Sequence, residues 1–190
     1  MGSIILVTGG ARSGKSEFAE RYAAVHGKQI AYIATAEIWD EEMKRRVNLH
    51  RARRPKNWQT YEAPRNADAA IRQAGKEHDV ILFDCLTLYL SNYLCRPEAA
   101  EMSAGDLTEG VRQLTERLID AAREQAGTVI FVTNEVGAGI VPENRLARLY
   151  RDLAGRMNQQ MAVAAERVFA TICGLAVDWK KLAGETERGI

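Results

Sequence analysis

Near its N-terminus the chain carries the sequence GGARSGKS, from Gly9 to Ser16, directly after the apolar run IILVT. This spacing fits the pattern G-x-x-x-x-G-K-[S/T], in which glycines allow backbone N–H groups to turn towards phosphate oxygens. An amphipathic stretch, residues 16–25, follows the glycines. A strand, a glycine-rich turn and a helix in this order are the context that a phosphate-binding P-loop requires. The feature therefore indicates an α/β nucleotide-binding fold rather than an ordinary Gly/Ser turn.

The P-loop pattern assigns roles to its residues. Lys15 is placed to reach the β and γ phosphates, and the hydroxyl of Ser16 to ligate Mg²⁺. The positive end of the following helix dipole points at the same anion. The nucleotide phosphates are expected to contact all eight residues of the loop, namely Gly9, Gly10, Ala11, Arg12, Ser13, Gly14, Lys15 and Ser16. A P-loop alone does not define the reaction, because kinases, motors and switches share it.

The rest of the chain alternates between strand-like and helix-like segments. Short, almost wholly apolar runs predict buried strands at 4–8, 29–34, 80–84, 128–133 and 168–173. Longer segments rich in Ala, Leu, Glu, Gln and Arg predict helices at 16–25, 40–53, 65–76, 107–125 and 145–166. This alternation predicts a P-loop NTPase-type α/β fold, with a mostly parallel sheet flanked by helices on both faces. We expect one domain over residues 1–183, an irregular loop at 96–105 and a fraying tail at 184–190.

Composition excludes several classes of protein. The 190 residues are 46% apolar and 27% charged with a formal net charge of +1, so no overall field attracts nucleic acid or an anionic membrane. No apolar run approaches the roughly 20 residues of a membrane span, and the N-terminus lacks a signal-peptide pattern. Cys85, Cys95 and Cys173 lie far apart, which argues against a zinc site or a disulfide framework. We therefore expect a cytoplasmic protein with reduced, buried cysteines.

Asp84 ends the apolar run VILFD. The carboxyl ends of strands are where parallel α/β sheets bind their ligands, so this carboxylate is a candidate to hold Mg²⁺ beside the P-loop. The structural alternative is that Asp84 caps the helix that follows, and the two roles are compatible.

A basic segment extends from residue 44 to residue 61, with seven Lys or Arg residues and no acid. Trp39, Met43, Val47 and His50 are spaced as one apolar stripe of a helix, and arginines follow His50 directly. An arginine cluster opposes protonation of a nearby imidazole and can bind a polyphosphate. From the residues alone, His50 is a nucleophile towards phosphorus, a phosphate-binding residue or a structural histidine. The contexts of His26 and His78 indicate structural roles.

A second segment, residues 133–145, follows the predicted strand at 128–133. Asn134, Glu135 and Glu143 bring polar groups to this loop, and glycines and a proline shape it. The sequence supports two interpretations equally, a loop of the binding site or the punctuation that begins the next helix.

Taken together, the segments GGARSGKS, IAT at 33–35, DEEM…RR…H at 40–50, RP..W.T.E.P at 54–64, TNEVG.GIVPENRLAR at 133–148 and RDLAGR.NQ at 151–159 resemble one family. This is the bifunctional adenosylcobinamide kinase/adenosylcobinamide-phosphate guanylyltransferase family of cobalamin biosynthesis. The resemblance covers nearly the whole chain in the same order. It stops before residues 180–190, to which it gives no role.

The resemblance implies a reaction in two steps. The enzyme phosphorylates the aminopropanol hydroxyl of adenosylcobinamide, with ATP or GTP as donor, and then transfers GMP from GTP onto that phosphate to give adenosyl-GDP-cobinamide. The position that matches the family's nucleophile, which carries GMP as a guanylyl-histidine, is His50. The resemblance further implies Mg²⁺ at Ser16 and Asp84, a corrinoid as the small-molecule partner and a homo-oligomer, with a trimer expected.

By the same matching, further residues complete the nucleotide site. They are Ala34, Thr35, Ala36, Arg51, Ala52, Arg53, Arg54, Glu62 and Asp84. Some members have serine where this chain has Ala36, so a hydroxyl contact is lost here. Some have glutamate where this chain has Asp84, which changes the reach of the carboxylate.

Two other functions compete with this interpretation. One is a P-loop kinase for a small metabolite without the transferase step, which has no use for His50. The other is a nucleotide-dependent switch or ATPase, which turns over nucleotide without an acceptor and is not labelled by α-³²P GTP. The near-neutral charge disfavours a nucleic-acid motor.

Overall fold

The structure, a computed structural model, describes residues 2–38 and 40–187. Within these ranges, six side chains are outside the description: Arg46, His50, Arg53, Glu185, Thr186 and Glu187. The chain forms a seven-stranded sheet in the order β3-β2-β4-β5-β1-β6-β7. All neighbouring strands are parallel except β6 and β7, which form an antiparallel pair. The predicted mostly parallel α/β fold is confirmed.

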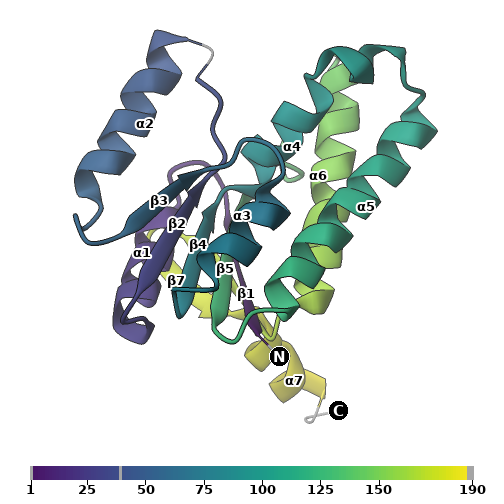
Figure 1. The fold of residues 1–190 in the computed structure, drawn as a ribbon. Coiled ribbons are helices and arrows are strands. Elements are labelled where there is room, and N and C mark those ends of the chain that lie inside the picture. The colour runs from purple at the N-terminus through teal and green to yellow at the C-terminus, as the bar shows by residue number, and fades with distance from the viewer. Residues whose placement is uncertain (1, 39, 188–190) are drawn as a thin grey trace.

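The strands are β1 (Ser3–Gly9), β2 (Ile30–Ala34), β3 (Gln59–Glu62), β4 (Val80–Asp84), β5 (Thr128–Asn134), β6 (Arg167–Ile172) and β7 (Leu175–Asp178). The helices are α1 (Lys15–His26), α2 (Glu41–Arg53), α3 (Ala67–Ala74), α4 (Leu86–Leu94), α5 (Ala104–Arg123), α6 (Arg145–Ala164) and α7 (Trp179–Glu187), with a short 3-10 helix η1 (Pro97–Glu101). Figure 1 shows α3, α5 and α6 on one side of the sheet and α2 extending past the ends of the strands.

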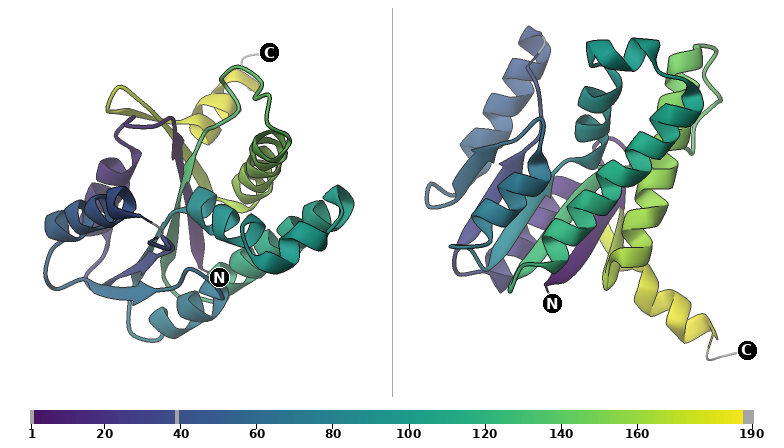
Figure 2. Two further views of the ribbon diagram at one scale, coloured as in Figure 1. Left: turned by 90° about the horizontal axis from the view of Figure 1, so that it is seen from above. Right: turned by 45° about the vertical axis from the view of Figure 1, so that its right-hand side comes forward.

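The sheet buries an apolar layer on each face because its central strands are parallel and almost wholly apolar, and their successive side chains point to opposite faces. In β4, Val80 and Leu82 join the cluster that packs under α1, whereas Ile81 and Phe83 join the larger cluster under α3, α5 and α6. Helices therefore cover both faces, as expected. The same layers are seen from above and from a view turned by 45° about the vertical axis (Figure 2).

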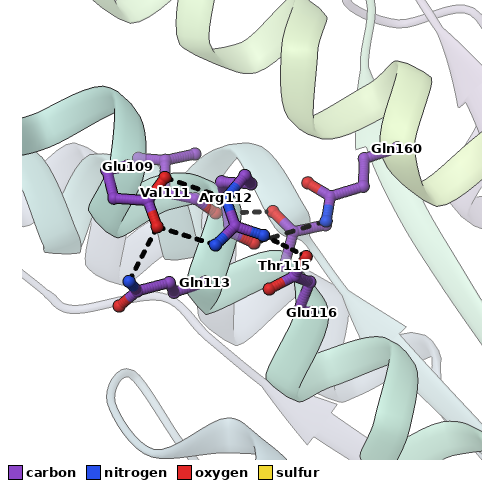
Figure 3. A network of polar contacts seen from close by, with 7 residues as sticks. All are labelled: Glu109, Val111, Arg112, Gln113, Thr115, Glu116 and Gln160. Carbon is purple, nitrogen blue, oxygen red and sulfur yellow. Dashed lines mark hydrogen bonds and ion pairs between the residues drawn. The ribbon is translucent and has the colours of Figure 1, made fainter. Parts of the chain in front are cut away.

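The two longest helices also meet through polar contacts at the surface. Arg112 of α5 forms ion pairs with Glu109 and Glu116 of the same helix, and Gln160 of α6 donates a hydrogen bond to the backbone oxygen of Arg112 (Figure 3). Beneath this polar rim, the buried side chains of the two helices belong to one apolar cluster. The rim and the cluster together fix α5 against α6.

Several expectations need correction. The predicted loop at 96–105 contains η1, and β3, β7, α4 and α7 were not predicted at all. α7 includes residues 184–187 of the expected tail, and residues 188–190 lie outside the described part. Only Cys85 of the three cysteines is buried, because Cys95 ends α4 at the surface and Cys173 lies in the exposed turn between β6 and β7. Among the described residues, no helix is long and apolar enough to cross a membrane.

At the amino-terminal edge of the sheet, Asp79 joins β4 to β2. Its carboxylate accepts hydrogen bonds from the backbone N–H groups of Lys28 and Gln29, at 2.9–3.1 Å. Burial raises the pKa of Asp79, but these bonds outweigh it and the pKa is lowered overall. A lowered carboxyl pKa contributes stability above the unfolded-state pKa of about 3.9, and this stability is lost as the pH falls through the folded value.

We therefore expect Asp79→Asn to lower the free energy of unfolding at neutral pH by an amount that shrinks as the pH falls below about 4. Urea unfolding of both proteins over a series of pH values measures this difference. A deficit that stays constant down to the lowest pH would contradict the role of the charge.

Candidate nucleotide-binding site

The P-loop connects β1 to α1 in the geometry that anion binding needs. Gly14, the N-cap of α1, has a φ of 96°, and Arg12 has a φ of 56°, so the loop contains two left-handed residues. A Cβ atom at Gly9 would lie 2.4 Å from the Thr171 hydroxyl, which requires glycine there. A Cβ at Gly10 would meet no atom within 4 Å. The backbone at Gly10 thus borders open space at the N-terminus of a helix, where a phosphate is stabilised.

Lys15 is the buried cation of this site. Its side chain belongs to a residue only 9% exposed, and Nζ donates a hydrogen bond to the backbone oxygen of Gly10 at 3.1 Å. Burial lowers the pKa of Lys15, while the charges of Cys85 and Asp84 act in the opposite direction. The ammonium group is therefore near the end of β4 and within the loop that surrounds the open space.

Strand β6 and the turn that follows it form hydrogen bonds with the P-loop. The Thr171 hydroxyl donates to the backbone oxygen of Thr8 at 3.2 Å, so it accepts from the Ser13 hydroxyl, 2.8 Å away. The backbone N–H of Gly174 donates to the backbone oxygen of Ser13 at 2.9 Å. Both hydroxyls are buried. The loop conformation therefore depends on hydrogen bonds from β6 and from the turn that follows it.

We expect Thr171→Val to leave the Ser13 hydroxyl without its acceptor and to lower the free energy of unfolding by about 1–3 kcal/mol. Nucleotide affinity should fall as well, because Ser13 is part of the loop. Chemical denaturation and nucleotide titration measure the two effects. Thr108→Val on α5, where the hydroxyl bonds only its own helix, is the matched control. Equal behaviour of the two variants would refute the support role of Thr171.

Asp84 ends β4 at the same edge of the sheet, with β5 between its strand and the P-loop strand. One carboxylate oxygen accepts a hydrogen bond from the Tyr32 hydroxyl at 2.8 Å. The N-cap of the following helix α4 is Cys85, so the alternative that Asp84 caps this helix is wrong. The carboxylate is part-buried and close to Lys15, as a residue that holds Mg²⁺ beside a P-loop should be.

The segment 34–36 is fixed beside Asp84. Thr35 is fully buried, and its hydroxyl donates to the backbone oxygen of Cys85 and accepts from the Cys85 N–H. Asn92 of α4 donates to the backbone oxygen of Thr35 at 2.7 Å. Ala34 lies opposite Asp84 in the sheet register, and Ala36 is half-buried. The structure thus brings the three residues of this segment to the edge that carries Asp84.

Part of the basic segment reaches the same edge. Arg54, just after α2, lies over the ring of Tyr32, with Cζ 3.4 Å from the ring centroid. Arg51 forms an ion pair with Glu62, which pairs with Ala34 in the sheet. Ala52 is exposed on α2 and is not brought to the edge by any contact that the structure describes.

The backbone of His50 lies in the last turns of α2, and its side chain is outside the described part of the chain, as is that of Arg53. Of the predicted apolar stripe, Met43 and Val47 are half-buried, and Trp39 lies outside the described residues.

Sequence reasoning missed the role of Tyr32 and left Asn134 undecided. Tyr32 looked like one more residue of a buried strand, and only its hydroxyl distinguished it from its neighbours. Asn134, at the end of β5, donates to the Thr87 hydroxyl at 2.7 Å, so it lies at the binding edge. Asn144 caps α6 by accepting from the Ala147 N–H, so the loop at 133–145 also starts a helix. His26 and His78 bond backbone oxygens of their own helical segments, in agreement with structural roles.

The oxygen donors suit a magnesium ion that is shared with a nucleotide. Among the described residues, no group of three or more His, Cys, Asp and Glu side chains is placed to hold a metal by itself. Mg²⁺ usually takes one or two protein oxygens together with phosphate oxygens and water. The Ser16 hydroxyl in the first turn of α1 and the Asp84 carboxylate supply such a set.

The comparisons with known proteins agree with this geometry. The family described as cobinamide kinase / cobinamide phosphate guanyltransferase matches residues 5–179. The bifunctional adenosylcobalamin biosynthesis protein CobU of Escherichia coli (strain K12) is 41% identical over 93% of this chain and 99% of its own. The CobU protein of Salmonella typhimurium is 42% identical over 93% of this chain and 99% of its own. The CobP protein of Pseudomonas aeruginosa is 43% identical over 92% of this chain and 96% of its own.

Solved structures support the fold. A prototypical ATPase from the type III secretion system of pathogenic bacteria aligns with a TM-score of 0.58 at 13% identity, over 98% of this chain. This chain spans about half of that one, 54% of its length. The likeness shows a shared α/β fold and nothing finer. The family match over residues 5–179 and the near full-length relatives decide the identity: the chain belongs to the cobinamide kinase / cobinamide phosphate guanyltransferase family.

Proposed function

We propose that this protein phosphorylates adenosylcobinamide, with ATP or GTP as donor, and then transfers GMP from GTP to the product, giving adenosyl-GDP-cobinamide. The observation that carries the proposal is the P-loop with open space at Gly10 and a buried Lys15. It lies at the sheet edge where Asp84, Arg51 and Arg54 also lie. Family membership supplies the substrate and the two reactions.

In the kinase step, the aminopropanol hydroxyl oxygen of the corrinoid attacks the γ-phosphorus. The bond from that phosphorus to the β–γ bridging oxygen breaks, the nucleoside diphosphate leaves, and the hydroxyl proton passes to water. Lys15 and the N–H groups of residues 9–16 hold the phosphate oxygens and offset the charge on them. Mg²⁺, held through Ser16 and Asp84, supplies further positive charge at the phosphates.

In the transfer step, an imidazole nitrogen of His50 attacks the α-phosphorus of GTP. An N–P bond forms, the bond from the α-phosphorus to the α–β bridging oxygen breaks, and pyrophosphate leaves. Arg51, Arg53 and Arg54 stabilise the charge of the leaving pyrophosphate. An oxygen of adenosylcobinamide phosphate then attacks the same phosphorus, and the N–P bond breaks. A covalent intermediate separates the departure of pyrophosphate from the arrival of the bulky acceptor.

The nucleotide contacts that we propose are those of residues 9–16 together with Ala34, Thr35, Ala36, Arg51, Ala52, Arg53, Arg54, Glu62 and Asp84. The two hydrogen bonds between Thr35 and Cys85 and the Arg51–Glu62 ion pair support this set. Ala52 enters it through the family resemblance alone.

We further propose that the protein works in the cytoplasm as a homo-oligomer, with a trimer as the expected state. The resemblance supports this, and so do exposed apolar side chains at the β6–β7 edge, where Ile172 is 68% and Leu175 is 74% exposed. Analytical ultracentrifugation measures the state, and a monomer at all concentrations would refute it.

Two isotopic labels test the function. The purified protein is incubated with Mg²⁺ and adenosylcobinamide, with either γ-³²P ATP or α-³²P GTP, and the corrinoid is separated and counted. Label from both nucleotides in the corrinoid is the expected result. Label from the γ position alone would indicate a metabolite kinase without the transferase step. Nucleotide turnover with no labelled corrinoid would indicate a switch or ATPase.

A further inference from the structure

Tyr32 occupies a central place at the binding edge. It lies in β2, is 3% exposed and points to the α1 side of the sheet, with the cluster that includes Leu82 and Val132. In the sheet register Tyr32 is opposite Leu82 and Ala34 is opposite Asp84. Side chains two positions apart on a strand share a face, so Asp84 is on the same face as Tyr32, one step nearer to the binding edge.

The two ends of this side chain contact two different parts of the site. The hydroxyl donates a hydrogen bond to Oδ2 of Asp84 at 2.8 Å. The ring carries the guanidinium of Arg54, whose Cζ is 3.4 Å from the centroid. Arg54 also donates to the Thr60 hydroxyl through Nη1 at 3.3 Å. Its Nε is buried and has no hydrogen-bond partner among the described residues, so one donor stays available.

The hydrogen bond from the tyrosine hydroxyl fixes one oxygen of the Asp84 carboxylate. Within the part of the chain that the structure describes, the other oxygen has no hydrogen bond, so it is free to face a cation.

We propose that Tyr32 is a positioning residue of the nucleotide site: its hydroxyl orients the Asp84 carboxylate towards the Mg²⁺ of the bound nucleotide, and its ring orients Arg54 towards the triphosphate. The inference rests on the function proposed above and deepens it. One rigid, buried ring thereby links the residue that holds the metal to the segment that follows His50. Because the ring has only two rotatable bonds, little freedom is lost in holding both partners.

Two variants of Tyr32 test the role of its hydroxyl and the role of its ring separately. Tyr32→Phe keeps the ring under Arg54 and removes only the bond to Asp84. Tyr32→Leu removes the ring as well. Tyr61→Phe, on the neighbouring strand β3, is the matched control, since Tyr61 packs on the opposite face of the sheet.

The primary measurement is equilibrium binding without turnover. A fluorescent GTP analogue with a methylene bridge between the α and β phosphates is titrated with Mg²⁺, because the transfer reaction cannot cleave that bridge. For Tyr32→Phe we expect the Mg²⁺ concentration at half-saturation to rise about tenfold, the scale for losing one hydrogen bond to a charged group. At saturating Mg²⁺ the affinity for the analogue should return to that of the wild type.

For Tyr32→Leu we expect an additional loss of analogue affinity, about fivefold to tenfold, that Mg²⁺ does not restore, since the cation–π contact that orients Arg54 is gone. In the labelling reaction, Tyr32→Phe should raise KM for GTP at low Mg²⁺ and leave kcat at saturating Mg²⁺ within about twofold. Tyr61→Phe should match the wild type in every measurement.

Unchanged Mg²⁺ dependence in Tyr32→Phe, with a wild type that binds the analogue, would overturn this inference and leave the proposed function standing. An equal loss at all Mg²⁺ concentrations, together with a lowered melting temperature, would show that Tyr32 is merely structural and would also overturn it. A wild type that neither binds the analogue nor becomes labelled by α-³²P GTP would refute the proposed function first, and this inference with it.

Discussion

Replacing His50 with alanine should abolish covalent labelling of the protein by α-³²P GTP and reduce guanylyl transfer by at least about 10³-fold, the scale for losing a covalent nucleophile. The physical reason is that the proposed N–P bond is to the imidazole of His50, and the neighbouring arginines cannot replace it because arginine does not lose its proton in proteins. The kinase step, which uses the P-loop and not the imidazole, should stay within a few-fold of the wild type. A denaturing gel of protein incubated with the labelled nucleotide and Mg²⁺ gives the first result, and corrinoid labelled from γ-³²P ATP gives the second.

The control is His26→Ala, which removes a histidine at the far end of α1 whose Nδ1 contacts only the backbone of its own helix and whose ring stacks on Tyr22. This variant should be labelled like the wild type. The label should be lost in acid and stable in base, as a phosphorus–nitrogen bond is. A label that survives in His50→Ala would mean that another residue carries GMP, and one that is stable in acid would mean that the bond is not to nitrogen.

Lys15→Met should reduce both half-reactions by about 10²–10³-fold, because the one buried ammonium of the P-loop serves the phosphates in each step. The thermal stability of Lys15→Met, in contrast, should not fall. Since burial lowers the pKa of Lys15, the folded state resists its charged form, and this cost to folding disappears as the pH rises. An uncharged side chain of similar length removes that cost at neutral pH, so the melting temperature should be equal to or above that of the wild type.

Initial rates of both label transfers and a thermal melt at pH 7 test this pair of effects. Lys28→Met, at the opposite edge of the sheet where the backbone N–H of Lys28 bonds Asp79, is the matched control and should change neither rate. A Lys15→Met protein with low activity and a clearly lower melting temperature would attribute the loss to misfolding. Full activity of Lys15→Met would show that Lys15 has no role in either reaction.

The sequence predicted the centre of the fold and the position of the P-loop between β1 and α1. The strands β1, β2, β4 and β5 are buried on both faces, so their apolar runs are recognisable without any partner. The P-loop is local, and its glycines, its lysine and the helix that follows are adjacent in the chain. Asp84 was recognisable because it ends an apolar run. Each of these features can be recognised from a few consecutive residues.

The missed features depend on contacts between distant residues. β3 is an edge strand of four residues, QTYE, which are mostly exposed and carry no apolar run. α4 directly follows β4, and its many buried residues hid the boundary between strand and helix. Tyr32 acts through Asp84 and Arg54, which are 52 and 22 positions away, so no local pattern contains it.

The bonds from the β6–β7 turn to Ser13 have a consequence for the order in which the site is completed during synthesis. The ribosome makes residues 9–16 well before it makes Thr171 and Gly174. A nascent chain that has released only β1 to β5 already contains every residue of the proposed nucleotide contacts. It still lacks the groups that fix Ser13. The support of the P-loop is thus completed after the loop itself, although the residues proposed to bind phosphate are made first.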